Sequence, residues 1–179
     1  MKNYRDGFIE ELKTTDRKKT TFYKNPFNKI PEWESFTERK KYSFEHGVGN
    51  ILIPTKNMFM ISEGFVPPEI FDEIFDGYKE VVSSIEEAFG KMSLHEPVIF
   101  MSDESTENEG FWRHSDQNDR FHWNCIGSSH WYIWDRDTDE EQEFILDVGD
   151  LLYIPFRTDH QVRSLTEKRG AITVIMHGV

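Results

Sequence analysis

Short apolar segments crowd the chain from Pro97 onward, and they restrict its possible folds more than any other feature. They recur roughly every ten residues and are separated by turn-forming Gly, Pro, Asn, Asp and Ser. The segments with strand character are 98–101, 111–114, 120–126, 130–134, 143–147, 151–154, 161–165 and 171–176, with earlier candidates at 48–53 and 58–61. Such a series predicts a mainly β domain, either a sandwich or a small barrel.

One segment before these strands has the periodicity of an amphipathic helix. Apolar residues recur there at three- and four-residue steps: Ile70, Ile74, Tyr78, Val81, Val82, Ile85 and Phe89. Pro67 and Pro68 precede the segment and Gly90 follows it, which is the usual asymmetry of helix ends. The pattern predicts one long helix over about 69–89, with its apolar face in the core.

The N-terminal residues 1–45 are predicted to form an irregular arm, because they are polar and interrupted by Pro26 and Pro31. The arm nevertheless holds more aromatic side chains than a disordered tail would carry. They are Phe22, Tyr23, Phe27, Trp33 and Phe36. We therefore expect residues 1–45 to be an extension that packs on a single domain formed by residues 46–179.

The charge of the chain is unevenly distributed, and this bears on its partners. The net charge is −12, but residues 1–56 hold 12 basic and 8 acidic side chains, so the remainder carries −16. A domain this acidic repels nucleic-acid phosphates, which makes nucleic acid a less favoured partner than a basic peptide or protein. A small-molecule substrate is equally compatible with the sequence, and no pattern indicates an oligomeric state.

The single cysteine, Cys125, cannot form an internal disulfide and is typical of a reducing compartment. Its position in a strand predicts a buried small hydrophobic side chain. Apolar runs fall short of the roughly 18–20 residues that a membrane span needs, and the N-terminus lacks the apolar core of a signal peptide. We therefore expect a cytoplasmic or otherwise intracellular protein without a membrane partner.

Two separate stretches bring together residue types that bind metals. The first is GFWRHSDQNDRFHWNCI, in which His114 and Asp116 are two residues apart and would share one face of a strand. The second is GDLLYIPFRTDH, a short apolar strand followed by Pro155, a loop and His160. If His160 folds back beside the pair, two imidazoles and one carboxylate form the facial triad of non-haem iron(II) oxygenases.

Both stretches resemble the metal-binding blocks of JmjC-like, cupin-fold 2-oxoglutarate oxygenases. The run HSDQNDRFHWNCIGSSHW is similar to the first block of that family, and GDLLYIPFRTDHQV is similar to the second. The resemblance covers about residues 97–176. It implies a double-stranded β-helix that binds Fe(II) through His114, Asp116 and His160. It also implies a hydroxylase or demethylase that consumes 2-oxoglutarate, releases succinate and CO2, and acts on a protein, peptide or other C–H substrate.

The sequence departs from the family at the residue that pairs with the distal carboxylate of 2-oxoglutarate. The family commonly has Lys or Arg two residues after the turn glycine, where this chain has Ser129, which cannot neutralise a carboxylate, followed by His130, which could do so only if protonated. Both are nevertheless candidates for contacts with 2-oxoglutarate in the pocket. Other 2-oxoglutarate oxygenases place the basic residue at the start of the final strand, and Arg169 stands there. Its planar guanidinium suits a carboxylate. Arg120, at the start of an earlier strand, is a second candidate.

Further residues are predicted to line the same pocket. His122 and Asn124 alternate along one strand, so they share a face and could bind 2-oxoglutarate or water. Trp112 and Trp123 could supply aromatic walls around the substrate. Each of these four side chains could equally be an ordinary structural residue of the sandwich.

Two other readings fit the sequence. The chain could be a metal-dependent cupin enzyme that does not use 2-oxoglutarate, which the serine at position 129 favours. Alternatively, it could be a metal-free β-sandwich that serves as a binding module, with His114 and Asp116 as ordinary strand residues. A metal assay separates these two interpretations, because the cupin enzyme would bind a metal ion and the binding module would not.

Overall fold

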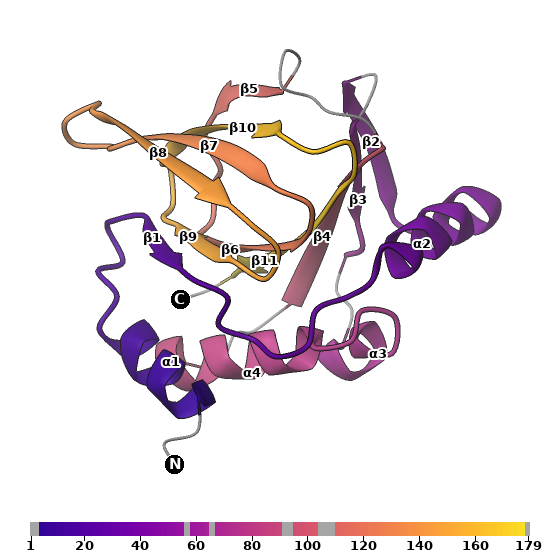
Figure 1. The fold of residues 1–179 in the computed structure, drawn as a ribbon, viewed down its shortest axis with the longest axis horizontal. Helices are drawn as coiled ribbons and strands as arrows, with labels where there is room; N and C mark the ends of the chain where they lie inside the picture. Colours follow the sequence, from indigo (N-terminus) through magenta and orange to yellow (C-terminus); the bar gives the residue numbers. More distant parts are fainter. Residues whose placement is uncertain (1–3, 56–57, 65–66, 91–94, 104–109, 178–179) are drawn as a thin grey trace.

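Two antiparallel sheets face each other, and helices cover the outer face of the larger sheet (Figure 1). The computed structural model describes residues 4–55, 58–64, 67–90, 95–103 and 110–177. The larger sheet has the order β1-β9-β6-β11-β4-β3-β2 and the smaller one β5-β10-β7-β8. Because β5, β6, β7, β8, β9, β10 and β11 pass back and forth between the sheets, the C-terminal part of the chain encloses a space between them. The fold is mainly β, as predicted.

The strand bounds agree closely with those predicted from the sequence. In the larger sheet they are Thr21–Tyr23 for β1, Leu151–Ile154 for β9, Arg120–Ile126 for β6, Arg169–Met176 for β11, His95–Ser102 for β4, Met58–Ser62 for β3 and Asn50–Thr55 for β2. In the smaller sheet they are Phe111–His114 for β5, Asp159–Ser164 for β10, Ser129–Trp134 for β7 and Glu141–Leu146 for β8. The alternating and apolar patterns were therefore sufficient to locate the strands except β1, which lies in the arm that was predicted to be irregular.

Side-chain alternation divides the larger sheet into two different faces. On β6, Phe121, Trp123 and Cys125 point to the helices and belong to the main core. The intervening Arg120 and His122 point into the space between the sheets, where they line a cavity. A smaller apolar cluster closes the rest of that space, formed by Trp131, Ile133, Leu146, Leu152, Ile154 and Val162.

The segment predicted as one helix over 69–89 forms two helices, α3 (Pro68–Asp72) and α4 (Tyr78–Phe89). The break ends at Gly77, which has a φ of 95°. A Cβ at this position would lie 2.8 Å from the carbonyl oxygen of Lys29, so the close approach of the N-terminal arm requires glycine. The apolar face of α4 is buried as predicted, whereas Ile70 on α3 is 53% exposed.

The N-terminal arm is more regular than predicted. It contains α1 (Tyr4–Lys13), β1 and α2 (Trp33–His46), and β1 pairs with β9 at the end of the larger sheet. Its buried residues Leu12, Phe27 and Phe36 join the main core. The aromatic residues of the arm therefore pack on the sheet, and α2 runs across the expected boundary at residue 45. None of the described helices combines the length and apolarity that a bilayer-spanning helix requires.

Candidate functional site

The structure brings His114, Asp116 and His160 together at one end of the space between the sheets. His114 ends β5, His160 lies in β10, and the two residues are paired across these strands. Asp116 lies in the turn just after β5. The ligand atoms of all three side chains lie within 4.8 Å of one another, and the two imidazole rings are 4.3 Å apart. Two histidines and a carboxylate thus surround a single point, as the facial triad requires.

Backbone contacts fix the orientation of both imidazoles. The Nδ1 atom of His114 lies 2.8 Å from the carbonyl oxygen of Trp112, and that of His160 lies 3.0 Å from the carbonyl oxygen of Thr158. A carbonyl can only accept a hydrogen bond, so each Nδ1 donates a proton, which leaves Nε2 as the atom of each ring that can bind a metal. The Nε2 of His160 lies 3.2 Å from Oδ2 of Asp116. A cation placed between these two atoms would be bound by both.

The electrostatics of the triad also suit a bound cation. Burial lowers the pKa of His114, and the neighbouring His160 lowers it further, which disfavours a protonated imidazole. Burial alone would raise the pKa of Asp116, but the hydrogen bond to His160 and the charge of Arg120 outweigh it, so the pKa is lowered. Arg120 lies 2.5 Å from Oδ2 of Asp116. The donor set is therefore an ionised carboxylate with two imidazoles whose Nε2 atoms lie 3.2 and 3.9 Å from it, and it fits a divalent metal.

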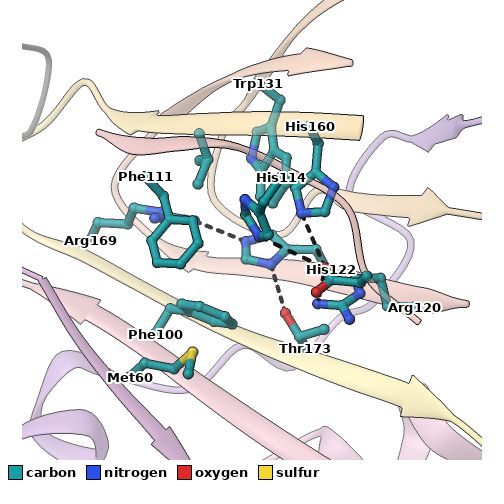
Figure 2. A pocket seen from close by; sticks show the side chains of 12 residues that line it. Met60, Phe100, Phe111, His114, Arg120, His122, Trp131, His160, Arg169 and Thr173 are labelled. Carbon is teal, nitrogen blue, oxygen red and sulfur yellow. Dashed lines mark hydrogen bonds and ion pairs between the residues drawn. The ribbon is translucent and has the colours of Figure 1, made fainter. Parts of the chain in front are cut away.

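The triad opens into a cavity of about 150 Å³ between the sheets (Figure 2). Apolar side chains form much of its wall, namely Met60, Phe100, Phe111, Trp131 and Val162. An apolar cavity of roughly this volume can hold a molecule the size of benzene, and pockets for drug-sized ligands exceed about 300 Å³. The cavity is thus matched to a small ligand.

Arg169 lines the same cavity and is almost completely buried, with 1% of its surface exposed. Its terminal nitrogen Nη2 donates to Nε2 of His122 at 3.1 Å, and its Nε has no hydrogen-bond partner. Within the described part of the chain, no carboxylate forms an ion pair with it. Burial lowers the pKa of Arg169 to about 10, which leaves the guanidinium charged at neutral pH. Because no described residue neutralises this buried cation, an anionic ligand in the cavity would stabilise it.

Comparison with solved structures identifies the architecture. The Escherichia coli ribosomal oxygenase YcfD superposes with a TM-score of 0.66 at 16% identity, over 96% of this chain and 51% of that protein. A complex of YcfD with cobalt and succinic acid gives a TM-score of 0.67 at 17% identity, with the same coverage. A variant of Bacillus subtilis oxalate decarboxylase gives 0.50 at 14% identity, over 73% of this chain and 28% of that protein.

The chain has the cupin fold. The likeness confirms the double-stranded β-helix that the two sequence blocks implied. The chain spans about half the length of the ribosomal oxygenase it resembles. No protein-family model matches the sequence, and a search of curated protein sequences finds no match.

Several residues predicted in the pocket serve the framework of the cupin fold instead. The amide nitrogen of Asn124 donates to the carbonyl oxygens of Gly127 and Asp147, and its amide oxygen accepts from Ser129. His130 faces away from the cavity, 2.7 Å from a carboxylate oxygen of Glu143. The structure thus places Asn124, Ser129 and His130 outside the cavity, because β-strand alternation and turn bonding use their polar atoms elsewhere.

Neither tryptophan predicted as a wall lines the cavity. Trp123 is fully buried among the helices on the opposite face of β6, one residue out of phase with His122. Trp112 is 62% exposed on the outer surface of β5. Aromatic walls do exist, but Phe100, Phe111 and Trp131 supply them.

Sequence reasoning missed Thr173, whose hydroxyl lies 2.8 Å from Nδ1 of His122. The residue is four positions after Arg169 on β11 and therefore shares its face. It is also the cross-strand partner of His122. Alternation along β11 could have placed Thr173 on the cavity side, but its contact with His122 depends on a strand register that the sequence does not specify.

Proposed function

We propose that the chain is an Fe(II)- and 2-oxoglutarate-dependent oxygenase that acts on a protein or peptide. The observation that carries the proposal is the pairing of two features in one cavity. The triad of His114, Asp116 and His160 can hold the metal, and the guanidinium of Arg169, which has no ion-pair partner among the described residues, can hold a carboxylate. A 2-oxo acid with a second carboxylate matches both features at once.

The burial of the site residues indicates how this ligand would be oriented in the cavity. The side chains of His114 and Asp116 are 27% and 23% exposed, whereas Arg169 is 1% exposed and His122 is 2% exposed. The 2-oxo acid end would therefore meet the metal near the opening, and the distal carboxylate would meet Arg169 at the closed end. Arg169 is assigned this role in place of Ser129, which lacks charge and lies outside the cavity.

Each part of the chain then has a chemical task. Bound Fe(II) and 2-oxoglutarate would supply an oxidant for a substrate C–H bond, with release of succinate and CO2. The two histidines and Asp116 hold the metal, and backbone carbonyls orient the histidines. Phe100, Phe111 and Trp131 exclude water from the co-substrate. Arg120 keeps Asp116 ionised and oriented.

The cavity and the solved structures support a macromolecular substrate. A space of about 150 Å³ is largely filled by a small co-substrate, so the oxidised group would approach from the open side, next to His114. The ribosomal oxygenase with the same fold was studied with cobalt and succinic acid, and succinate is the product expected from 2-oxoglutarate. The acidic charge of residues 57–179 favours a basic protein segment.

Metal and co-substrate binding test the proposal directly. Protein loaded anaerobically with Fe(II) should hold one metal ion per chain, and 2-oxoglutarate should then raise its melting temperature. Admission of oxygen should yield succinate. His160→Ala should abolish stoichiometric metal binding, whereas the matched control His46→Ala, at an exposed histidine, should retain it. Equal metal content in the two variants would exclude the site.

A second function has specific support. The serine at position 129 and the likeness to oxalate decarboxylase favour a metal-dependent cupin enzyme that does not use 2-oxoglutarate. Such an enzyme would bind a metal through the same triad. In that case 2-oxoglutarate would leave the melting temperature of the metal-loaded protein unchanged, and Arg169 would bind another small anion.

A further inference from the structure

A chain of hydrogen bonds runs from Thr173 through His122 to Arg169 along the wall of the cavity (Figure 2). The hydroxyl of Thr173 lies 2.8 Å from Nδ1 of His122, and Nε2 of His122 lies 3.1 Å from Nη2 of Arg169. All three residues are buried, with 1–2% of their surfaces exposed. Water therefore has little access to these contacts, and each polar atom depends on its protein partner.

The chemistry of arginine determines the direction of these bonds. A guanidinium has only donors, so Nε2 of His122 must accept the bond from Arg169. The single proton of the neutral ring is then on Nδ1, where it is donated to the hydroxyl of Thr173. The opposite tautomer would place an N–H group against the guanidinium.

Arg169 depends on this contact for its orientation. Among the described residues, its Nε has no hydrogen-bond partner and no carboxylate forms an ion pair with it. A long side chain with one anchored nitrogen keeps its direction only while that anchor holds. His122 is the imidazole that supplies the anchor, and it lines the cavity next to Arg169.

We propose that His122, held by Thr173 as the Nδ1–H tautomer, is a positioning residue that aims Arg169 into the cavity and selects a 2-oxo acid with a distal carboxylate. This inference rests on the proposed function, since it concerns the recognition of 2-oxoglutarate. It assigns the selectivity to a Thr-His-Arg chain, in which Arg169 contacts the ligand and the other two residues act through it.

Two matched pairs of variants test this role. Thr173→Ser keeps the hydroxyl and Thr173→Val removes it. His122→Gln keeps an acceptor for Arg169, with an amide that can donate to Thr173, and His122→Leu removes both. The probes are 2-oxoglutarate and 2-oxobutanoate, which has the same 2-oxo acid end but no distal carboxylate. Dissociation constants are measured without oxygen on the Mn(II)-loaded protein.

The expected result is a selective loss of one ligand. Thr173→Val and His122→Leu should weaken 2-oxoglutarate binding by about tenfold or more, the range seen when a supporting partner of a site residue is removed. Affinities for 2-oxobutanoate and Mn(II) should stay within about twofold, and Thr173→Ser and His122→Gln should resemble the unaltered protein. Equal weakening of both 2-oxo acids, or no weakening of either, would overturn the proposal.

The tautomer can be measured without any ligand, which separates this inference from the proposed function. Two-bond ¹H–¹⁵N spectra of the imidazoles should show His122 with its proton on Nδ1, and its signals are identified by their loss in His122→Gln. A proton on Nε2 would refute the hydrogen-bond chain. If His122 had the expected tautomer but the protein did not bind 2-oxoglutarate, the proposed oxygenase function and the selectivity would both be refuted. The contact between His122 and Arg169 would still be supported.

Discussion

The two faces of the larger sheet meet opposite requirements, although they are built from alternate residues of the same strands. On β6, Phe121 and Trp123 face the helices in a core formed mainly by apolar side chains. Arg120 and His122, which alternate with them along the strand, face the cavity, where β11 adds Arg169. Within the described part of the chain, the Nε atoms of both arginines have no hydrogen-bond partner. The first face stabilises the fold, whereas the second holds buried polar groups at a cost that a ligand can offset.

The largest effect on stability is expected on the helix-facing side. Trp123→Ala should lower the free energy of unfolding by about 3–5 kcal/mol, because it removes a fully buried indole from a packed core. Denaturant titration measures this change. If the remaining protein is folded, its triad should still bind one metal ion, because Trp123 does not line the cavity.

A conservative change at the same position sharpens the test. The indole nitrogen of Trp123 has no hydrogen-bond partner within the described residues, so Trp123→Phe loses volume without orphaning a polar partner. Its cost should be clearly smaller than that of alanine. If Trp123→Phe and Trp123→Ala were equally destabilising, packing volume would not explain the role of Trp123.

The same alternation explains which parts of the site the sequence could predict. Period-two patterns located the strands other than β1 and grouped His122 with Asn124, and the two motifs predicted that His160 lies beside His114, its partner across β5 and β10. The pattern does not say which face of a strand meets the helices. Trp123 was therefore expected in the pocket, although it is one residue out of phase with His122.

Long-range contacts account for the remaining differences. Asn124 shares the face of His122, but the turn at Gly127 takes its amide group, and no local pattern reveals that bond. The helix expected over 69–89 is broken at Gly77 because the N-terminal arm passes close to it. Arg169 was chosen because other 2-oxoglutarate oxygenases place a basic residue at the start of the final strand, and in the structure it begins β11 and lines the cavity.

A substitution on the cavity side should change the free energy of unfolding in the opposite direction. Arg169→Leu removes a buried charge without a counter-ion, so the free energy of unfolding should rise by about 1–3 kcal/mol. The same variant should lose at least about tenfold in affinity for 2-oxoglutarate, because a charge-assisted hydrogen bond to the ligand contributes about 1.5–3 kcal/mol.

Denaturant titration and calorimetry on one preparation give both quantities. Arg136→Leu is the matched control, since Arg136 is a surface arginine away from the cavity and should change the free energy of unfolding by less than about 0.5 kcal/mol. A strong destabilisation by Arg169→Leu would show that Arg169 is a structural residue, and the contrast between the two faces would then disappear.

The smallest effect is expected at the turn that joins the two sheets beside the triad. Arg157 has a φ of 56°, and its backbone N–H donates to the carbonyl oxygen of Asp116 at 2.9 Å. A left-handed conformation costs a residue with a Cβ about 1–2 kcal/mol, and glycine avoids that cost but loses about 0.5–1 kcal/mol of chain entropy. Arg157→Gly should therefore raise the free energy of unfolding by about 0.5–1 kcal/mol.

Arg157→Ala keeps the Cβ and removes the guanidinium that lies over Phe156, so it should give no gain. If both variants raised stability equally, the side chain rather than the backbone would be the source of strain. If neither variant raised the free energy of unfolding, the backbone at Arg157 would not be strained. The buried charges would then be the feature of the cavity side that lowers stability.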